Sequence, residues 1–186
     1  MKKIVFWTLM ATYTMLVLAD GVLTWLNTPD LLMEGNPLVA QFGLGWGALA
    51  LANIVVLALV FGAGYYSFFV YQPRFNDETT FTRYISQLLF DRPDRFWTGL
   101  IPKHGKPYVA MLGEALLYAC IVGRVVIVAE WLAVSFSWYW EPWRQWKSAC
   151  LGHSYLLPAC LTALIVFMRW CYRQYRLNRE HKKGTD

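Results

Sequence analysis

The sequence predicts an all-α integral membrane protein, a four-helix transmembrane bundle with both ends of the chain in the cytoplasm. Its 186 residues are 57% hydrophobic and 16% charged, whereas average soluble domains carry about 25% charged residues. The apolar residues are gathered into four long blocks, which a soluble core of this size cannot bury. The basic residues lie beside alternate ends of these blocks, and this asymmetry predicts the orientation.

The four apolar blocks are the expected spans of a single transmembrane domain, residues 1–186. A span needs about 20 apolar residues, and each block comes close to this length or exceeds it. We expect residues 71–108 to form a cytoplasmic loop and residues 173–186 a basic cytoplasmic tail. The spans cover about residues 4–26, 42–70, 109–134 and 154–172.

The first block shares features with a cleavable signal peptide. Lys2 and Lys3 precede it, and small residues occupy the positions expected for cleavage around Ala19. However, the apolar character continues past that point through Leu23, and threonines interrupt the apolar run before it. We therefore expect residues 1–19 to be retained as part of the first span.

The distribution of lysine and arginine predicts the orientation of the spans. Two basic residues lie before the first span, six between the second and third, and six at or after the end of the fourth. The opposite loops hold two, Arg144 and Lys147. Because basic residues near spans are concentrated on the cytoplasmic side, both termini and the central loop are expected in the cytoplasm.

The start of the second block carries small residues at helical spacing. Gly43 and Gly47, with Ala48 and Ala52 beyond them, offer a face on which another helix can approach closely. The sequence leaves open whether this contact is made within the chain or between chains.

The central loop contains a predicted amphipathic helix at residues 79–90. Phe81, Ile85, Leu88 and Leu89 repeat at helical spacing, with polar residues between them. Such a stripe is typical of an interfacial helix that lies on the inner leaflet of the membrane. The alternative is that the same face binds a partner protein.

The external loop before the fourth span is rich in tryptophan. Indole rings favour the headgroup region, where the ring is half buried and its N–H stays hydrated. An aromatic belt is therefore the expected role, and a stacking platform for a ligand is the alternative. The residues are Trp138, Trp140, Trp143 and Trp146.

Four ionisable residues lie within the predicted spans: Asp20, Glu114, Arg124 and Glu130. Such groups cost about 2.5–3.5 kcal/mol on insertion scales and need a partner or a hydrated cavity. At 1.5 Å per residue, Asp20 lies about 9 Å and Arg124 about 15 Å from the outer ends of their spans. Since an arginine side chain can reach outward, we expect these two residues to form an ion pair.

Polar residues of the outer half of the bundle form a candidate binding site. Asp20 and Thr24 share one helix face, and the following loop continues the cluster. Carboxylates beside an imidazole suit a metal ion or acid–base chemistry. The alternative is that Asp20 and Arg124 pair structurally, which leaves the loop carboxylates in solvent. The candidate cluster is Asp20, Thr24, Glu34, Asn36, Arg124, Glu130 and His153.

Part of this cluster resembles a known pattern. Asp20-Gly21-Val22-Leu23-Thr24, followed by Glu34-Gly35-Asn36-Pro37, is similar to a D-x-x-x-T…E-x-N-P pattern. That pattern occurs in a group of small, uncharacterised prokaryotic multi-pass membrane proteins, where it ends the first span and opens the second. The resemblance covers residues 19–38. It implies that the motif residues act together, but it implies no activity.

The sequence leaves three classes of function open. The favoured one is a non-catalytic accessory or assembly subunit of a membrane complex. The second is a membrane-embedded enzyme or metal site facing the outer leaflet, built on Asp20, Glu34 and His153. The third is a small oligomeric transporter or channel.

The expected surroundings of the chain follow from its composition and its resemblance. We expect a multi-pass protein of the bacterial cytoplasmic (inner) membrane. Its partners would be the lipid bilayer and either another membrane protein or a second copy of the chain. No cofactor is expected. No nucleic acid is expected either, because the net charge of +5 comes from basic residues that flank the spans.

The orientation can be tested with reporter fusions. A reporter that is active only in the cytoplasm should be active when fused at Asp186, and one that is active only in the periplasm should be active when fused at Ser148. A periplasmic Asp186 would contradict the predicted topology.

Overall fold

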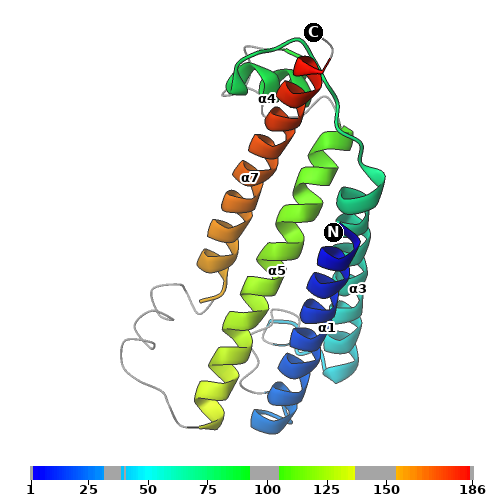
Figure 1. Ribbon diagram of the computed structural model, residues 1–186. Helices are drawn as coiled ribbons and strands as arrows, with labels where there is room; N and C mark the ends of the chain where they lie inside the picture. The colour runs from blue at the N-terminus through cyan, green and yellow to red at the C-terminus, as the bar shows by residue number, and fades with distance from the viewer. Residues whose placement is uncertain (1, 32–38, 40, 93–104, 137–153, 185–186) are drawn as a thin grey trace.

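The computed structural model describes residues 2–31, 39, 41–92, 105–136 and 154–184, and over these residues the protein is all-α (Figure 1). Four long helices are each long and apolar enough to cross a membrane, as expected of a small multi-pass membrane protein. A shorter helix, α4 (Phe81–Phe90), lies at one end of the bundle. The long helices are α1 (Lys2–Asn27), α3 (Trp46–Tyr65) with the π-helical turn η1 (Tyr66–Val70), α5 (Gly105–Ser135) and α7 (Leu156–Lys183).

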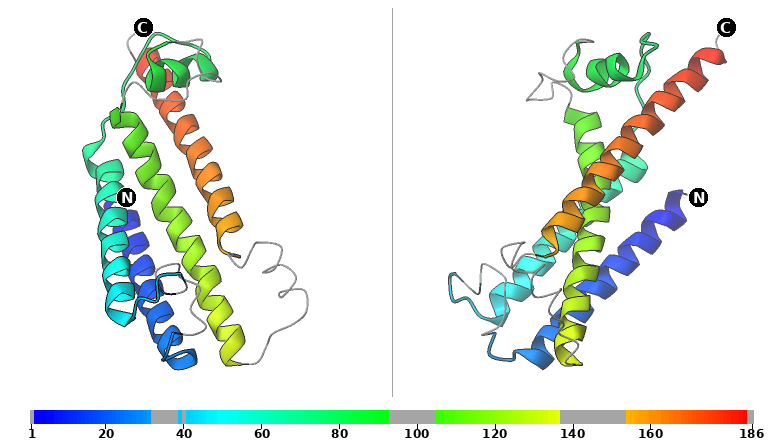
Figure 2. Two further views of the ribbon diagram at one scale, coloured as in Figure 1. Left: turned by 180° about the vertical axis from the view of Figure 1, so that it is seen from behind. Right: turned by 90° about the vertical axis from the view of Figure 1, so that its left-hand side faces the viewer.

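Helix α5 is the centre of the bundle. Helices α1, α3 and α7 all pack against it. Within the described part of the chain, α7 contacts neither α1 nor α3. Figure 2 shows this arrangement from behind, with α1 and α3 on one side of α5 and α7 on the other. Helix α5 therefore links α7 to α1 and α3, which also contact each other.

The first of two apolar cores joins α1, α3 and α5. Phe6, Met10 and Tyr13 of α1 meet Val60 of α3 and Leu117 of α5, and all five are buried. Aromatic rings of η1 extend this core onto the phenylalanine of α1 with ring-centre distances of 5.1 and 5.6 Å. Side chains from three helices thus form the apolar core of one half of the bundle.

Close contact between α3 and α5 depends on a glycine. A Cβ atom added to Gly113 of α5 would lie 2.2 Å from the carbonyl oxygen of Ala63, which is a backbone atom and cannot rotate away. At Gly47 in the small-residue stretch that the sequence singled out, an added Cβ would have no neighbour within 4 Å among the described residues. The close approach therefore occurs at Gly113, at the other end of α3.

Two of the long helices extend beyond the spans predicted from the sequence. Helix α5 begins at Gly105 and has 31 residues, and α7 has 28 residues and ends at Lys183. At 1.5 Å per residue these are about 46 and 42 Å long, whereas the hydrocarbon layer is about 30 Å thick. The residues after 172, which we expected to form a tail, therefore continue the fourth helix.

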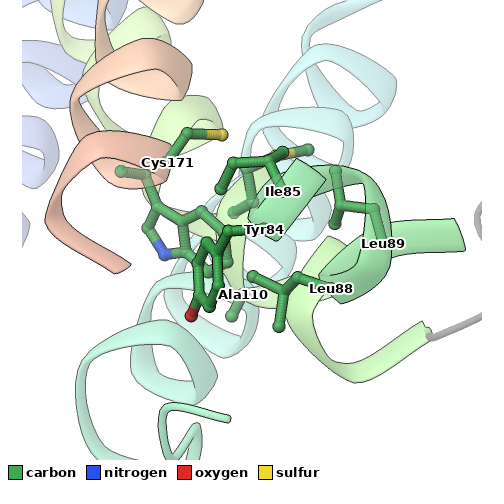
Figure 3. Close-up of a cluster of buried hydrophobic side chains, with 8 residues drawn as sticks. Tyr84, Ile85, Leu88, Leu89, Ala110 and Cys171 are labelled. Carbon is green, nitrogen blue, oxygen red and sulfur yellow. The ribbon is translucent and has the colours of Figure 1, made fainter. Parts of the chain in front are cut away.

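Helix α4 packs inside the protein. Its Ile85, Leu88 and Leu89 are at most 4% exposed, in the second apolar core, which also contains Trp170 and Cys171 of α7 (Figure 3). A helix does occupy most of the segment predicted at residues 79–90, but the sequence placed its apolar face on lipid. In the structure the chain's own helices α5 and α7 cover it, because both project far enough to receive it.

The segment before α4 is fastened to α7 by hydrogen bonds. The backbone N–H of Asn76 donates to Asn178 Oδ1 at 3.0 Å, and Tyr175 Oη donates to the carbonyl of Thr79 at 2.6 Å. Asn178 is fully buried. We refer to residues 71–92 together with residues 170–183 as the α4–α7 platform.

The buried Tyr84 and the half-buried Tyr71 complete the platform. Tyr84 Oη donates to the carbonyl of Arg74 at 2.8 Å. Burial raises the pKa of Tyr71 to about 12, and it raises the pKa of Tyr84 as well. A phenol is already neutral at physiological pH, and the raised pKa values keep both side chains neutral in more alkaline solution as well.

The close contact at Gly113 predicts a specific instability. Gly113→Ala should lower the free energy of unfolding by about 1–3 kcal/mol, since the extra methyl group overpacks the interface between α3 and α5. The control is Gly62→Ala on α3, where an added Cβ has no neighbour within 4 Å. Thermal unfolding of both purified variants in detergent would measure the difference. Equal stability of the two would contradict the close approach.

Candidate functional site

Arg124 is the centre of the polar site within the bundle. It lies on α5, and its guanidinium bonds two other helices. Nη1 donates to Asp20 Oδ2 of α1, and Nη2 donates to Asn53 Oδ1 of α3. The side chains of Arg124 and Asp20 are only 18% and 12% exposed. The ion pair that we expected from the depths of the two residues is confirmed.

Further side chains surround this ion pair. Thr24 and Trp131 lie close to the Asp20 carboxylate, and the hydroxyl of Tyr13 lies close to both Arg124 and the Cys120 thiol. Thr24 is 2% exposed and Tyr13 is 1% exposed. The site is thus a polar network enclosed by α1, α3 and α5.

The arrangement limits the chemistry available to Asp20. The Asp20 carboxylate accepts a charge-assisted hydrogen bond from Arg124, and Thr24 and Trp131 lie close to it. A carboxylate bound to a guanidinium is a poor ligand for a cation, because the cation must displace this donor and lie near a positive charge. Among the described residues, no three His, Cys, Asp or Glu side chains are close enough to hold a metal ion.

Two further polar contacts tie α5 to its neighbours at the end of the bundle away from α4. Ser154 Oγ donates to Glu130 Oε1, which joins the start of α7 to α5. Asn27 Nδ2 donates to Ser135 Oγ at 2.8 Å, which joins the end of α1 to the end of α5. Glu130 was expected in the candidate cluster, and in the structure it faces α7.

Part of the predicted cluster lies outside the described residues. Glu34, Asn36 and His153 are in this group, together with Pro37 of the D-x-x-x-T…E-x-N-P pattern. The four tryptophans of the loop before α7 are also outside it. The structure brings together Asp20, Thr24 and Arg124, and a ligand site that includes the loop residues stays a prediction.

A second buried ion pair lies toward the α4 end of the bundle. Arg173 of α7 holds both carboxylate oxygens of Glu114, with Nη2–Oε2 at 2.6 Å and Nη1–Oε1 at 3.2 Å. The Glu114 side chain is 5% exposed, whereas that of Arg173 is 37% exposed. In this two-bond geometry the planar fork of the guanidinium matches both oxygens of the carboxylate. It fixes α7 to α5 where α7 leaves its most apolar stretch.

The two ion pairs are separated by apolar packing. Leu117 lies between Glu114 and Arg124 along α5, and it is fully buried against Phe6 and Met10 of α1. In the described part of one chain, the cluster around Arg124 and the ion pair of Arg173 are therefore separate.

The roles of three residues in these clusters were not predicted from the sequence. Asn53 is the one side-chain amide in α3 and could have been noticed as the one strongly polar residue of that span. Trp131 gave no signal, since indoles are common near membrane surfaces. Arg173 was counted as part of a basic tail, and only its four-residue distance from Arg169 places it near the span.

Comparisons with protein-family models, with curated proteins and with solved structures find no match for this chain. The role of the site is therefore argued from its own residues. Its geometry is that of a structural ion-pair network, in which one arginine on the central helix joins α1 and α3.

The pairing predicts a non-additive response to mutation. Asp20→Asn should lower the free energy of unfolding by about 3–5 kcal/mol, because it leaves the Arg124 charge buried without its partner. Adding Arg124→Gln should restore much of this loss. Thermal unfolding of the wild type, both single variants and the double variant would measure the coupling energy.

A matched control is the exposed pair Arg176–Glu180 on α7, which is 3.3 Å apart with side chains at least 60% exposed. The same cycle there should give about 0.3–0.5 kcal/mol. Strict additivity at Asp20 and Arg124, or destabilisation of the wild type by chelators, would contradict the structural role.

Proposed function

We propose that this protein is a non-catalytic accessory or assembly subunit of a complex in the bacterial cytoplasmic membrane. Both of its termini lie in the cytoplasm, and its α4–α7 platform is the surface that holds the partner. The observation that carries the proposal is the platform itself. Its residues pack on one core and are fastened to two spans, so it can transmit a docking contact to the membrane part of the protein.

The charge of the platform indicates the chemistry of the partner. Residues 71–92 and 170–183 contain eight lysines and arginines and four aspartates and glutamates. Arg179 and Lys183 are exposed on the projecting end of α7. A rigid basic surface of this kind attracts an acidic surface and determines its orientation. The partner is therefore expected to present carboxylates on its cytoplasmic side.

The polar groups of the spans support a structural role over the two alternatives. An enzyme or metal site facing the outer leaflet would use Asp20, but Asp20 is occupied by Arg124 and its neighbours. A transporter or channel needs a polar route along the bundle. In the described part of one chain, the apolar layer at Leu117 separates the two polar clusters.

The proposal can be tested by purification from native membranes. The tagged wild-type chain, extracted in a gentle detergent, should retain a partner in fixed stoichiometry. The double variant Arg179→Gln/Lys183→Gln should lose most of that partner, since both residues lie on the exposed end of the platform. Raising the ionic strength to about 1 M should release the partner as well, because the Debye length falls to about 3 Å.

The control is Lys2→Gln/Lys3→Gln, which removes the same charge at the exposed start of α1, away from the platform. It should retain the partner at the wild-type ratio. A wild-type chain that purifies alone in several mild detergents would contradict the proposal. So would partner loss in both double variants alike.

A further inference from the structure

A row of residues on α7 changes from apolar to basic along one face of the helix. Leu161, Ile165, Arg169 and Arg173 follow one another at four-residue spacing, which keeps neighbours on adjoining parts of one helix surface. Leu161 and Ile165 are 51% and 67% exposed. This row marks the depth at which α7 passes from hydrocarbon to the headgroup region.

Arg169 is the unusual member of the row. It is exposed and lies one turn closer to the apolar part of α7 than Arg173. Among the described residues it forms no salt bridge, and the Glu114 carboxylate of α5 is held by Arg173. A lipid-facing arginine at this depth is costly unless its side chain reaches the headgroup layer and pairs with an anion there.

The side chains around Arg169 are hydrogen-bond donors. The Tyr118 phenol of α5 lies near both Arg169 and Arg173. Arg173 gives one N–H from each of two nitrogens to Glu114, and its side chain is 37% exposed, so further donors on its guanidinium are accessible. Because Arg173 and Glu114 neutralise each other, Arg169 leaves the cluster with one net positive charge. Two guanidinium groups and a hydroxyl suit the oxygens of a phosphate.

We infer that Arg169, Arg173 and Tyr118 form a binding site for the headgroup phosphate of an anionic phospholipid. The acyl chains of this lipid lie along the exposed Ile165 and Leu161. In the orientation proposed above, the lipid belongs to the cytoplasmic leaflet, where anionic headgroups favour such basic sites between helices. The site depends on the membrane-spanning arrangement and does not depend on the proposed protein partner.

The test uses the purified full-length chain in a neutral detergent, without any partner. Added phosphatidylglycerol should raise the midpoint of thermal unfolding, and phosphatidylcholine should raise it much less. In Arg169→Gln, the phosphatidylglycerol concentration needed for half of this shift should increase at least about tenfold, as expected when one charge-assisted contact of roughly 1.5 kcal/mol is lost. The matched control, Arg179→Gln, removes an exposed arginine ten residues further along α7 and should respond like the wild type.

Lipid retention, a lysine variant and inorganic phosphate provide further tests of the lipid site. Native mass spectrometry should find phosphatidylglycerol retained on the wild type and on Arg179→Gln, and lost from Arg169→Gln. Arg169→Lys, which keeps the charge and loses the planar donors, should give an intermediate response. An equal response of Arg169→Gln, or equal shifts with both lipids, would overturn the inference. A shift produced by inorganic phosphate alone at similar concentrations would assign the site to a free ion and reject the lipid.

Discussion

The structure depends on one physical constraint, the cost of an arginine at membrane depth. An isolated charge in hydrocarbon costs several kcal/mol, and the cost falls only if partners and hydrogen bonds replace water. Arg124 satisfies this requirement with a carboxylate from α1 and an amide from α3. Because the partners come from different helices, the charge is satisfied only when α1, α3 and α5 are assembled. The polar network thus selects one helix arrangement from many that apolar packing alone would allow.

The same device appears again on the other side of α5, with the charges exchanged. There the carboxylate, Glu114, is on the central helix and the arginine, Arg173, is on α7. Helix α5 thus contributes one residue to each ion pair, Arg124 to one and Glu114 to the other. Leu117 separates the two pairs with an apolar layer.

The four spans and the ion pair between Asp20 and Arg124 could be predicted because each follows from a large energy term. Hydrophobic length determines the spans, and the cost of buried charge determines the pair. The involvement of Asn53 could not be predicted with the same argument, since an uncharged amide costs far less and has many possible partners. The close approach at Gly113 depends on where α3 and α5 cross, and the hydropathy of the sequence does not determine the position of that crossing.

The placement of α4 shows a different limit of sequence reasoning. The spacing of Ile85, Leu88 and Leu89 determines which face is apolar, but lipid and protein both satisfy an apolar face. What decides between them is the length of α5 and α7. The sequence predicts the spans from the apolar stretches of these helices. It therefore predicted loops and a tail for the polar residues beyond those stretches. Once both helices continue past the membrane boundary, they form a surface that covers α4.

This geometry also determines how the parts of the molecule are connected. Helix α7 is fastened to α5 at both ends, by Ser154 with Glu130 at one and by Arg173 with Glu114 at the other. Between these points α7 lies beside Gly123 of α5, where an added Cβ would make an ordinary van der Waals contact with Ala159 at 3.8 Å. The platform rests on α7 and on the start of α5, whereas α7 contacts neither α1 nor α3 in the described part of the chain. Helix α7 is therefore connected to α1 and α3 through its packing on α5 and the bonds of Arg124, whereas residues 71–92 of the platform follow η1 and α3 directly in the chain.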